Sequence, residues 1–60
     1  MNTEQYKVLK HGFVLLKEAH KLKDWYMLNY GANIVEKFHN FKDFELVKEH
    51  ILEEIGWRND

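Results

Sequence analysis

Apolar side chains recur at helical spacing in three consecutive segments of this chain, and this periodicity is the strongest constraint on its fold. No proline interrupts the segments, and no stretch shows the alternation of apolar and polar residues that marks a strand. The sequence therefore predicts an all-α fold, a small three-helix bundle with helices over about residues 3–22, 24–39 and 43–55. The last residues, 58–60, are expected to form a frayed tail.

Sixty residues are enough for one small domain, residues 1–60. A domain of this size buries only about 60% of the surface that its unfolded chain exposes, so its stability margin is narrow. Small domains commonly compensate with disulfides, a bound metal or self-association, and this chain has no cysteine. Metal binding and self-association remain as the possible supplements.

The chain carries no sign of export or of membrane insertion. Its longest apolar runs, Phe13–Leu16 and Trp25–Leu28, hold four residues each, against the ~20 that a membrane-spanning helix needs. The first residues show no basic segment followed by an apolar one, as a secretory signal would. We therefore expect a cytoplasmic protein without a membrane partner.

Local signals mark where the helices begin and end. Asn2 or Thr3 can cap the first helix, and Asp24 can cap the second. The apolar arcs of these two helices differ in phase by about 90° when they are read as one spiral, which favours a break near Asp24. No glycine or proline enforces that break, so one long bent helix is the alternative. Gly56 and Trp57 are placed to end the third helix in a Schellman motif.

The apolar arcs of the first two helices are wider than packing inside one small bundle requires, since each exceeds half of the circumference. We predict that the second helix is central, with the first on one side and the third on the other. We also predict that helices one and two form a homodimer or small oligomer, with Gly12 and Gly31 at close helix crossings. The residues predicted to contact a partner or a second copy are Phe13, Leu16, Trp25, Met27, Tyr30, Gly31, Ile34 and Trp57.

Charge is distributed unevenly along the chain, although the net charge is only −1. Residues 1–23 carry a formal charge of +3, and residues 41–60 carry −3. Glu53 and Glu54 lie at the C-terminal, negative end of the third helix, where acidic side chains are unfavourable. We therefore expect the lysines of the first helix to lie beside these acids.

The same lysines support a second hypothesis, which is contact with nucleic acid. A row of lysines on one helix face can follow a phosphate backbone, and the residues concerned are Lys7, Lys10, Lys17 and Lys21. Against this, arginine makes the commonest specific base contacts, and the only arginine is Arg58. A solvated lysine face is the simpler interpretation.

Three residues are weak candidates for metal ligands, although we predict no metal site and no cofactor. Glu36 and His39 have the i, i+3 spacing that di-iron carboxylate sites use on helices, and His50 lies among further acids in the third helix. Such matches are expected by chance in a chain with ten acidic residues and four histidines. The chain has no serine or cysteine, so the common nucleophiles are missing. We predict that the protein is not an enzyme.

These features favour a non-enzymatic protein-interaction module, a regulator or inhibitor that binds another protein, itself, or both. Tryptophan and tyrosine dominate interface hot spots, and the chain has two and three of them respectively. Compact chains without cysteine are common in bacterial and phage genomes, so such an origin is a hypothesis here. Nucleic-acid binding and metal binding are the second and third hypotheses for function.

Overall fold

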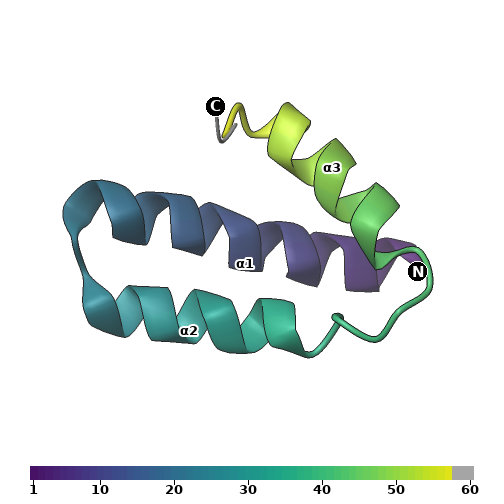
Figure 1. Cartoon of the computed structure of the whole chain (residues 1–60), viewed down its shortest axis with the longest axis horizontal. Helices are drawn as coiled ribbons and strands as arrows, with labels where there is room; N and C mark the ends of the chain where they lie inside the picture. Colours follow the sequence, from purple (N-terminus) through teal and green to yellow (C-terminus); the bar gives the residue numbers. More distant parts are fainter. Residues whose placement is uncertain (58–60) are drawn as a thin grey trace.

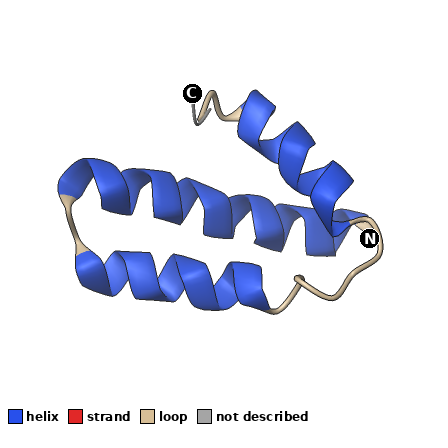
Figure 2. Cartoon of the chain, in the orientation of Figure 1, coloured by secondary structure: helices blue, strands red, loops and turns tan. Residues whose placement is uncertain are grey.

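The computed structural model describes residues 1–57, and within that range it contains three α-helices and no strand (Figures 1 and 2). Helix α1 spans Thr3–Leu22, α2 spans Trp25–Glu36 and α3 spans Phe44–Glu54. The all-α, three-helix prediction is confirmed. Helix α1 has the predicted bounds. Helix α2 begins at Trp25 instead of Asp24 and ends at Glu36 instead of His39, and α3 is one residue shorter at each end. The tail predicted to fray, residues 58–60, lies outside the described residues.

Helix α1 begins at a capping box. The Asn2 side chain accepts a hydrogen bond from the Gln5 backbone N–H at 2.8 Å, and the Gln5 side chain accepts one from the Asn2 N–H at 2.9 Å. These bonds satisfy N–H groups that have no intrahelical partner, so Asn2 is the cap that is used. Although α1 has 20 residues, neither it nor another helix in residues 1–57 is long and apolar enough to cross a lipid bilayer.

A turn at Lys23 and Asp24 separates α1 from α2, which excludes the alternative of one long bent helix. Lys23 adopts the left-handed conformation, with φ 55°, and the N–H groups of Lys23 and Asp24 both donate to the Ala19 carbonyl. The Asp24 carboxylate then accepts hydrogen bonds from the N–H groups of Tyr26 and Met27, both at 3.1 Å. Asp24 is thus the N-cap that the sequence predicts, and its charge suits the positive end of the helix.

Helix α2 ends early because Phe38 turns into the core. The N–H groups of Phe38 and His39 bond to carbonyls three residues back, at Val35 and Glu36, a tightening that often ends a helix. The Phe38 side chain is buried, and its ring centroid lies 5.3 Å from that of Phe41. Burial of the Phe38 ring stabilises this turn, so the chain turns here and α2 does not continue.

Helix α3 ends in the Schellman motif that the sequence predicts. The Trp57 N–H donates to the Leu52 carbonyl at 2.9 Å, and the Gly56 N–H donates to the Glu53 carbonyl at 3.2 Å. Gly56 has φ 72°, a left-handed conformation that a residue with a Cβ rarely adopts. The motif brings the Trp57 ring to α1, where its centroid lies 5.5 Å from that of His20.

Helix α1 occupies the centre of the fold, so the prediction of a central second helix is wrong. Both α2 and α3 pack on α1, whereas α2 and α3 do not pack on each other (Figure 1). The connection after α2 passes around the N-terminal end of α1 and places α3 on a different side of it. The wide apolar arc of α1 is therefore covered from two sides by its own chain.

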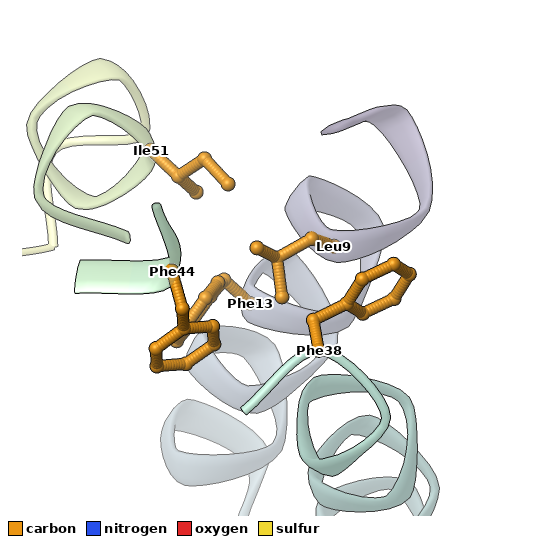
Figure 3. Close-up of a cluster of buried hydrophobic side chains, with 5 residues drawn as sticks. All are labelled: Leu9, Phe13, Phe38, Phe44 and Ile51. Carbon is orange, nitrogen blue, oxygen red and sulfur yellow. The ribbon is translucent and has the colours of Figure 1, made fainter. Parts of the chain in front are cut away.

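The core lies where α1, α3 and the connection between α2 and α3 meet. Its buried members are Leu9, Phe13, Phe38, Phe44 and Ile51 (Figure 3). Leu9 and Ile51 are the largest fully buried side chains among the described residues. Helix α3 contributes Phe44 and Ile51 to this cluster, and half-buried apolar residues of α3 and of its C-terminal end also pack against it, namely Val47, Leu52, Ile55 and Trp57.

Gly12 and Gly31 lie at a close crossing of α1 and α2 within one chain. A Cβ on Gly12 would lie 2.8 Å from Cγ2 of Ile34, which is closer than real Cβ contacts. A Cβ on Gly31 would lie 3.0 Å from the backbone oxygen of Gly12 and 3.2 Å from Cβ of Leu15. Glycine at both positions therefore allows the two helix backbones to approach each other.

Replacing Gly31 with leucine is expected to lower the free energy of unfolding by about 3 kcal/mol or more, because the added side chain overpacks the crossing against backbone. Ala32→Leu is the matched control, since Ala32 is the next residue and is exposed. Urea denaturation followed by circular dichroism measures both variants. Equal stability of the two variants would contradict the close crossing.

Lys23→Gly is expected to raise the free energy of unfolding by about 0.5–1 kcal/mol. The left-handed conformation costs a residue with a Cβ roughly 1–2 kcal/mol, and the greater freedom of glycine in the unfolded chain offsets part of the gain. Lys21→Gly, in the last turn of α1, is expected to lower the free energy of unfolding by about 1 kcal/mol. Urea titrations that show the same sign for both variants would contradict this assignment.

Candidate interaction surface

The residues predicted to contact a partner fall into separate places in the structure. Met27, Tyr30 and Ile34 lie on one flank of the α1–α2 hairpin. Phe13, Leu16 and Trp57 line a groove between α1 and α3. Trp25 is exposed at the start of α2, and Gly31 is buried in the helix crossing. The predicted set therefore spans two surfaces and part of the interior.

Two tyrosines on the hairpin are the most exposed of the tyrosine, tryptophan and phenylalanine side chains in residues 1–57. Tyr26 is 90% exposed and Tyr30 is 63% exposed. Tyr30 lines two shallow hollows of about 420 Å³ each, one on the N-terminal side of its ring and one on the C-terminal side. We name this surface the tyrosine face, and its residues are His11, Leu15, Tyr26, Met27, Tyr30, Asn33, Ile34 and Lys37.

The helix crossing decides which side of α2 becomes the tyrosine face. Gly31 lies against α1. At about 100° per residue, positions 26, 30, 33 and 37 fall within an arc of about 60° on one flank of α2. Their spacing of four, three and four residues aligns them in a stripe along the helix. The tyrosine face is therefore this stripe together with Met27 and Ile34 beside it and the adjoining edge of α1.

The tyrosine face carries little charge. Lys37 is the only lysine in its lining, His11 is the only histidine, and no carboxylate lines either hollow. Enrichment in aromatic residues and methionine with few charged residues is typical of the centre of a protein–protein interface. The composition and the shape of this surface therefore agree with a binding role.

A second recess, the tryptophan groove, lies between α1 and α3. It has a volume of about 180 Å³, and it is lined by Phe13, Leu16, Lys48, Leu52 and Trp57. The Schellman motif at the end of α3 positions Trp57 in this groove. Because Phe13 also belongs to the buried core, the floor of the groove is continuous with the interior of the chain.

The predicted contact between the lysines of α1 and the acidic end of α3 is present. The Lys10 ammonium forms an ion pair with the Glu54 carboxylate. Lys17 Nζ donates a hydrogen bond to the Ile55 carbonyl at 2.8 Å. Both lysines place positive charge at the negative end of α3, which offsets the unfavourable position of the acids there.

Two of the four lysines predicted to contact nucleic acid therefore have partners within the chain. Lys10 and Lys17 are held against α3, whereas Lys7 and Lys21 are exposed. A phosphate backbone that used all four would have to compete with α3 for the first two. The structure thus gives Lys10 and Lys17 a role in attaching α3 to α1.

Glu54 is the centre of a polar cluster that joins α1 to α3. The Tyr6 hydroxyl donates to Glu54 at 3.3 Å, and Nε2 of His50 lies 3.5 Å from the same carboxylate. The hydrogen bond from Lys10 lowers the pKa of Glu54 and, reciprocally, raises the pKa of Lys10. Partial burial, followed by the charge of Glu54, raises the pKa of Tyr6. None of these residues lines the tyrosine face or the tryptophan groove, so the cluster stabilises the helix contact.

The three weak candidates for metal ligands are not brought together. Glu36 and His39 lie exposed at the end of α2, and the His39 ring packs 5.6 Å from the ring of Phe44. His50 lies on α3 beside Glu54. Within residues 1–57, no three histidine, aspartate or glutamate side chains are grouped as a metal site would require.

Comparisons of the chain with protein-family models, with curated proteins and with solved structures found no match.

Sequence reasoning left five residues of the tyrosine face out of the predicted interface, namely His11, Leu15, Tyr26, Asn33 and Lys37. Tyr26 could have been included from its i, i+4 spacing to Tyr30. His11 and Leu15 carry no such signal, because their place on this surface depends on how α1 crosses α2.

Acidic pH is expected to destabilise the protein in part through Glu54. Its folded-state pKa lies below the ordinary value of 4.5, so its contribution is present above that value and is lost as the pH falls through the folded-state pKa. Glu54→Gln is therefore expected to show a smaller drop in melting temperature between about pH 7 and about pH 3 than the native chain. Glu49→Gln, exposed on the same helix, is the control. Superimposable pH profiles for Glu54→Gln and the native chain would contradict the role of this ion pair.

Proposed function

We propose that this protein is a non-enzymatic interaction module, a regulator or inhibitor that docks its tyrosine face on another protein. The observation that carries the proposal is the exposure of Tyr26 and Tyr30, at 90% and 63%, beside two hollows. Tyrosine offers a large contact area with few rotatable bonds, so binding it costs little conformational entropy. A contiguous apolar surface rimmed by polar residues is also what marks interaction sites on small proteins.

The two tyrosines could anchor a protein–protein interface, but they are too small to form all of it. An aromatic side chain buries 150–250 Å², so complete burial of the two tyrosines would remove roughly 300 Å² from water. A standard interface buries about 800 Å² on each partner. The remainder would come from the half-buried Leu15, Met27 and Ile34 and from the polar rim.

The other two hypotheses have weaker support. Nucleic-acid binding would draw on the lysine row, in which Lys10 and Lys17 already bind α3. A metal site would need Glu36 and His39 to meet His50, whereas Glu36 ends α2, His39 lies in the turn after it and His50 lies within α3. No single observation favours either hypothesis over docking through the tyrosine face.

The test compares three forms of the chain in the cells that produce it: the native chain, Tyr26→Ala/Tyr30→Ala and Leu46→Ala. Chemical cross-linking and mass spectrometry identify bound proteins. We expect a specific partner with the native chain and with Leu46→Ala, and its loss with the double variant. Leu46 is the matched control because it is 78% exposed yet lines neither hollow.

Thermal melting must first show that all three forms are folded. A partner that the double variant retains would contradict the proposal, as would the recovery of nucleic acid in place of a protein.

A further inference from the structure

We infer that a second copy of this chain covers the tyrosine face when no other protein does, and that the two α2 helices then run antiparallel. The inference rests on the proposed function, because it uses the same surface. It adds the identity of one partner and the register in which that partner binds.

The shape of the tyrosine face is self-complementary. A two-fold interface uses the same patch on both copies, so that patch must present both a projection and a recess. The rings of Tyr26 and Tyr30 are exposed, and the hollow lined by Asn33, Ile34 and Lys37 lies one turn further along the same stripe. The tyrosines of one copy can therefore enter the recess of the other while their own recess is filled in return.

The spacing of the stripe sets the register. When two α2 helices run antiparallel, position 26 faces position 37 of the other copy, and position 30 faces position 33. Each Tyr26 ring then lies beside the Lys37 ammonium of the other copy, a favourable cation–π arrangement. Each Tyr30 meets Asn33, whose side-chain amide can hydrogen-bond to its hydroxyl. Opposed helix dipoles also favour this orientation.

Charge disfavours the parallel alternative. In a parallel pair, position 37 faces position 37, so the two Lys37 ammonium groups would meet. Neither hollow of the tyrosine face is lined by a carboxylate that could offset their repulsion. In the antiparallel pair, the two lysines lie at opposite ends of the contact, about 16 Å apart along the helices, which exceeds the screening length of roughly 8 Å at physiological salt.

The area available indicates a weak dimer. Tyr26 and Tyr30 together contribute roughly 300 Å² per copy, against about 800 Å² in a standard interface. A reversible dimer of this kind leaves the face accessible to another protein that buries more surface. Self-association therefore competes with docking and does not prevent it.

Sedimentation equilibrium between about 1 µM and about 1 mM tests for the dimer. The native protein is expected to show a reversible monomer–dimer equilibrium in this range. Tyr26→Lys places a lysine opposite Lys37 at both ends of the contact and is expected to weaken the dimer at least about tenfold. Adding Lys37→Glu to this variant is expected to restore the dimer, because opposite charges then face each other. In a parallel pair the same double variant would set like charges together at both positions and would not restore it.

Leu46→Lys is the matched control, since Leu46 is an apolar residue on α3 that is 78% exposed and lies outside the tyrosine face. It adds the same charge and is expected to leave the dimer unchanged. Circular dichroism melts establish that every variant is folded. A native chain that is monomeric at about 1 mM, or a dimer indifferent to Tyr26→Lys, would overturn the inference; a dimer that the second substitution does not restore would overturn the antiparallel register.

The two proposals fail separately. A monomeric chain whose cross-linked partner still depends on Tyr26 and Tyr30 would overturn the second copy alone. The proposed function alone would be overturned if the dimer responds to Tyr26→Lys and Lys37→Glu as expected while the partner still binds the Tyr26→Ala/Tyr30→Ala variant.

Discussion

The close crossing of α1 and α2 at Gly12 and Gly31 is the contact on which the rest of the structure depends. Because neither position carries a Cβ, Ile34 reaches the backbone of α1 and the side chains of Leu15 and Leu16 reach the backbone of α2. This interlocking sets the rotation of α2 about its own axis. The same rotation that buries Gly31 turns the stripe of positions 26, 30, 33 and 37 to the outside, so the packing of the hairpin and the position of its candidate binding surface have one physical cause.

The attachment of α3 explains the role of much of the remaining charge. Phe44 and Ile51 are its two buried members of the core, half-buried apolar residues pack around them, and polar contacts from α1 supplement this packing. Lys10 and Lys17 reach the C-terminal end of α3, where the helix dipole and the acidic side chains both favour positive charge. These lysines are therefore part of the fold, and neither of them lines the tyrosine face.

Local signals were sufficient for the three helices and for most of their ends. The capping box at Asn2, the cap at Asp24 and the Schellman ending at Gly56 each depend on residues only a few positions apart, and the structure contains all three. The attraction between the lysines and the acids was also predictable, because opposite charges at the ends of the chain favour contact. The early end of α2 was not predictable, because it depends on Phe38 entering a core to which α1 and α3 also contribute.

By itself, the sequence determined that this chain forms three helices, where two glycines would permit close packing, and that its aromatic residues exceed the needs of a small core. Only the tertiary structure decided that α1 is the central helix and that Tyr26 and Tyr30 face outward while Phe13 faces inward. The physical reason is that an apolar arc wider than half a helix allows several rotations against a neighbour. The contacts of Gly12 and Gly31 across the hairpin, together with the path of the connection around the end of α1, select one of them.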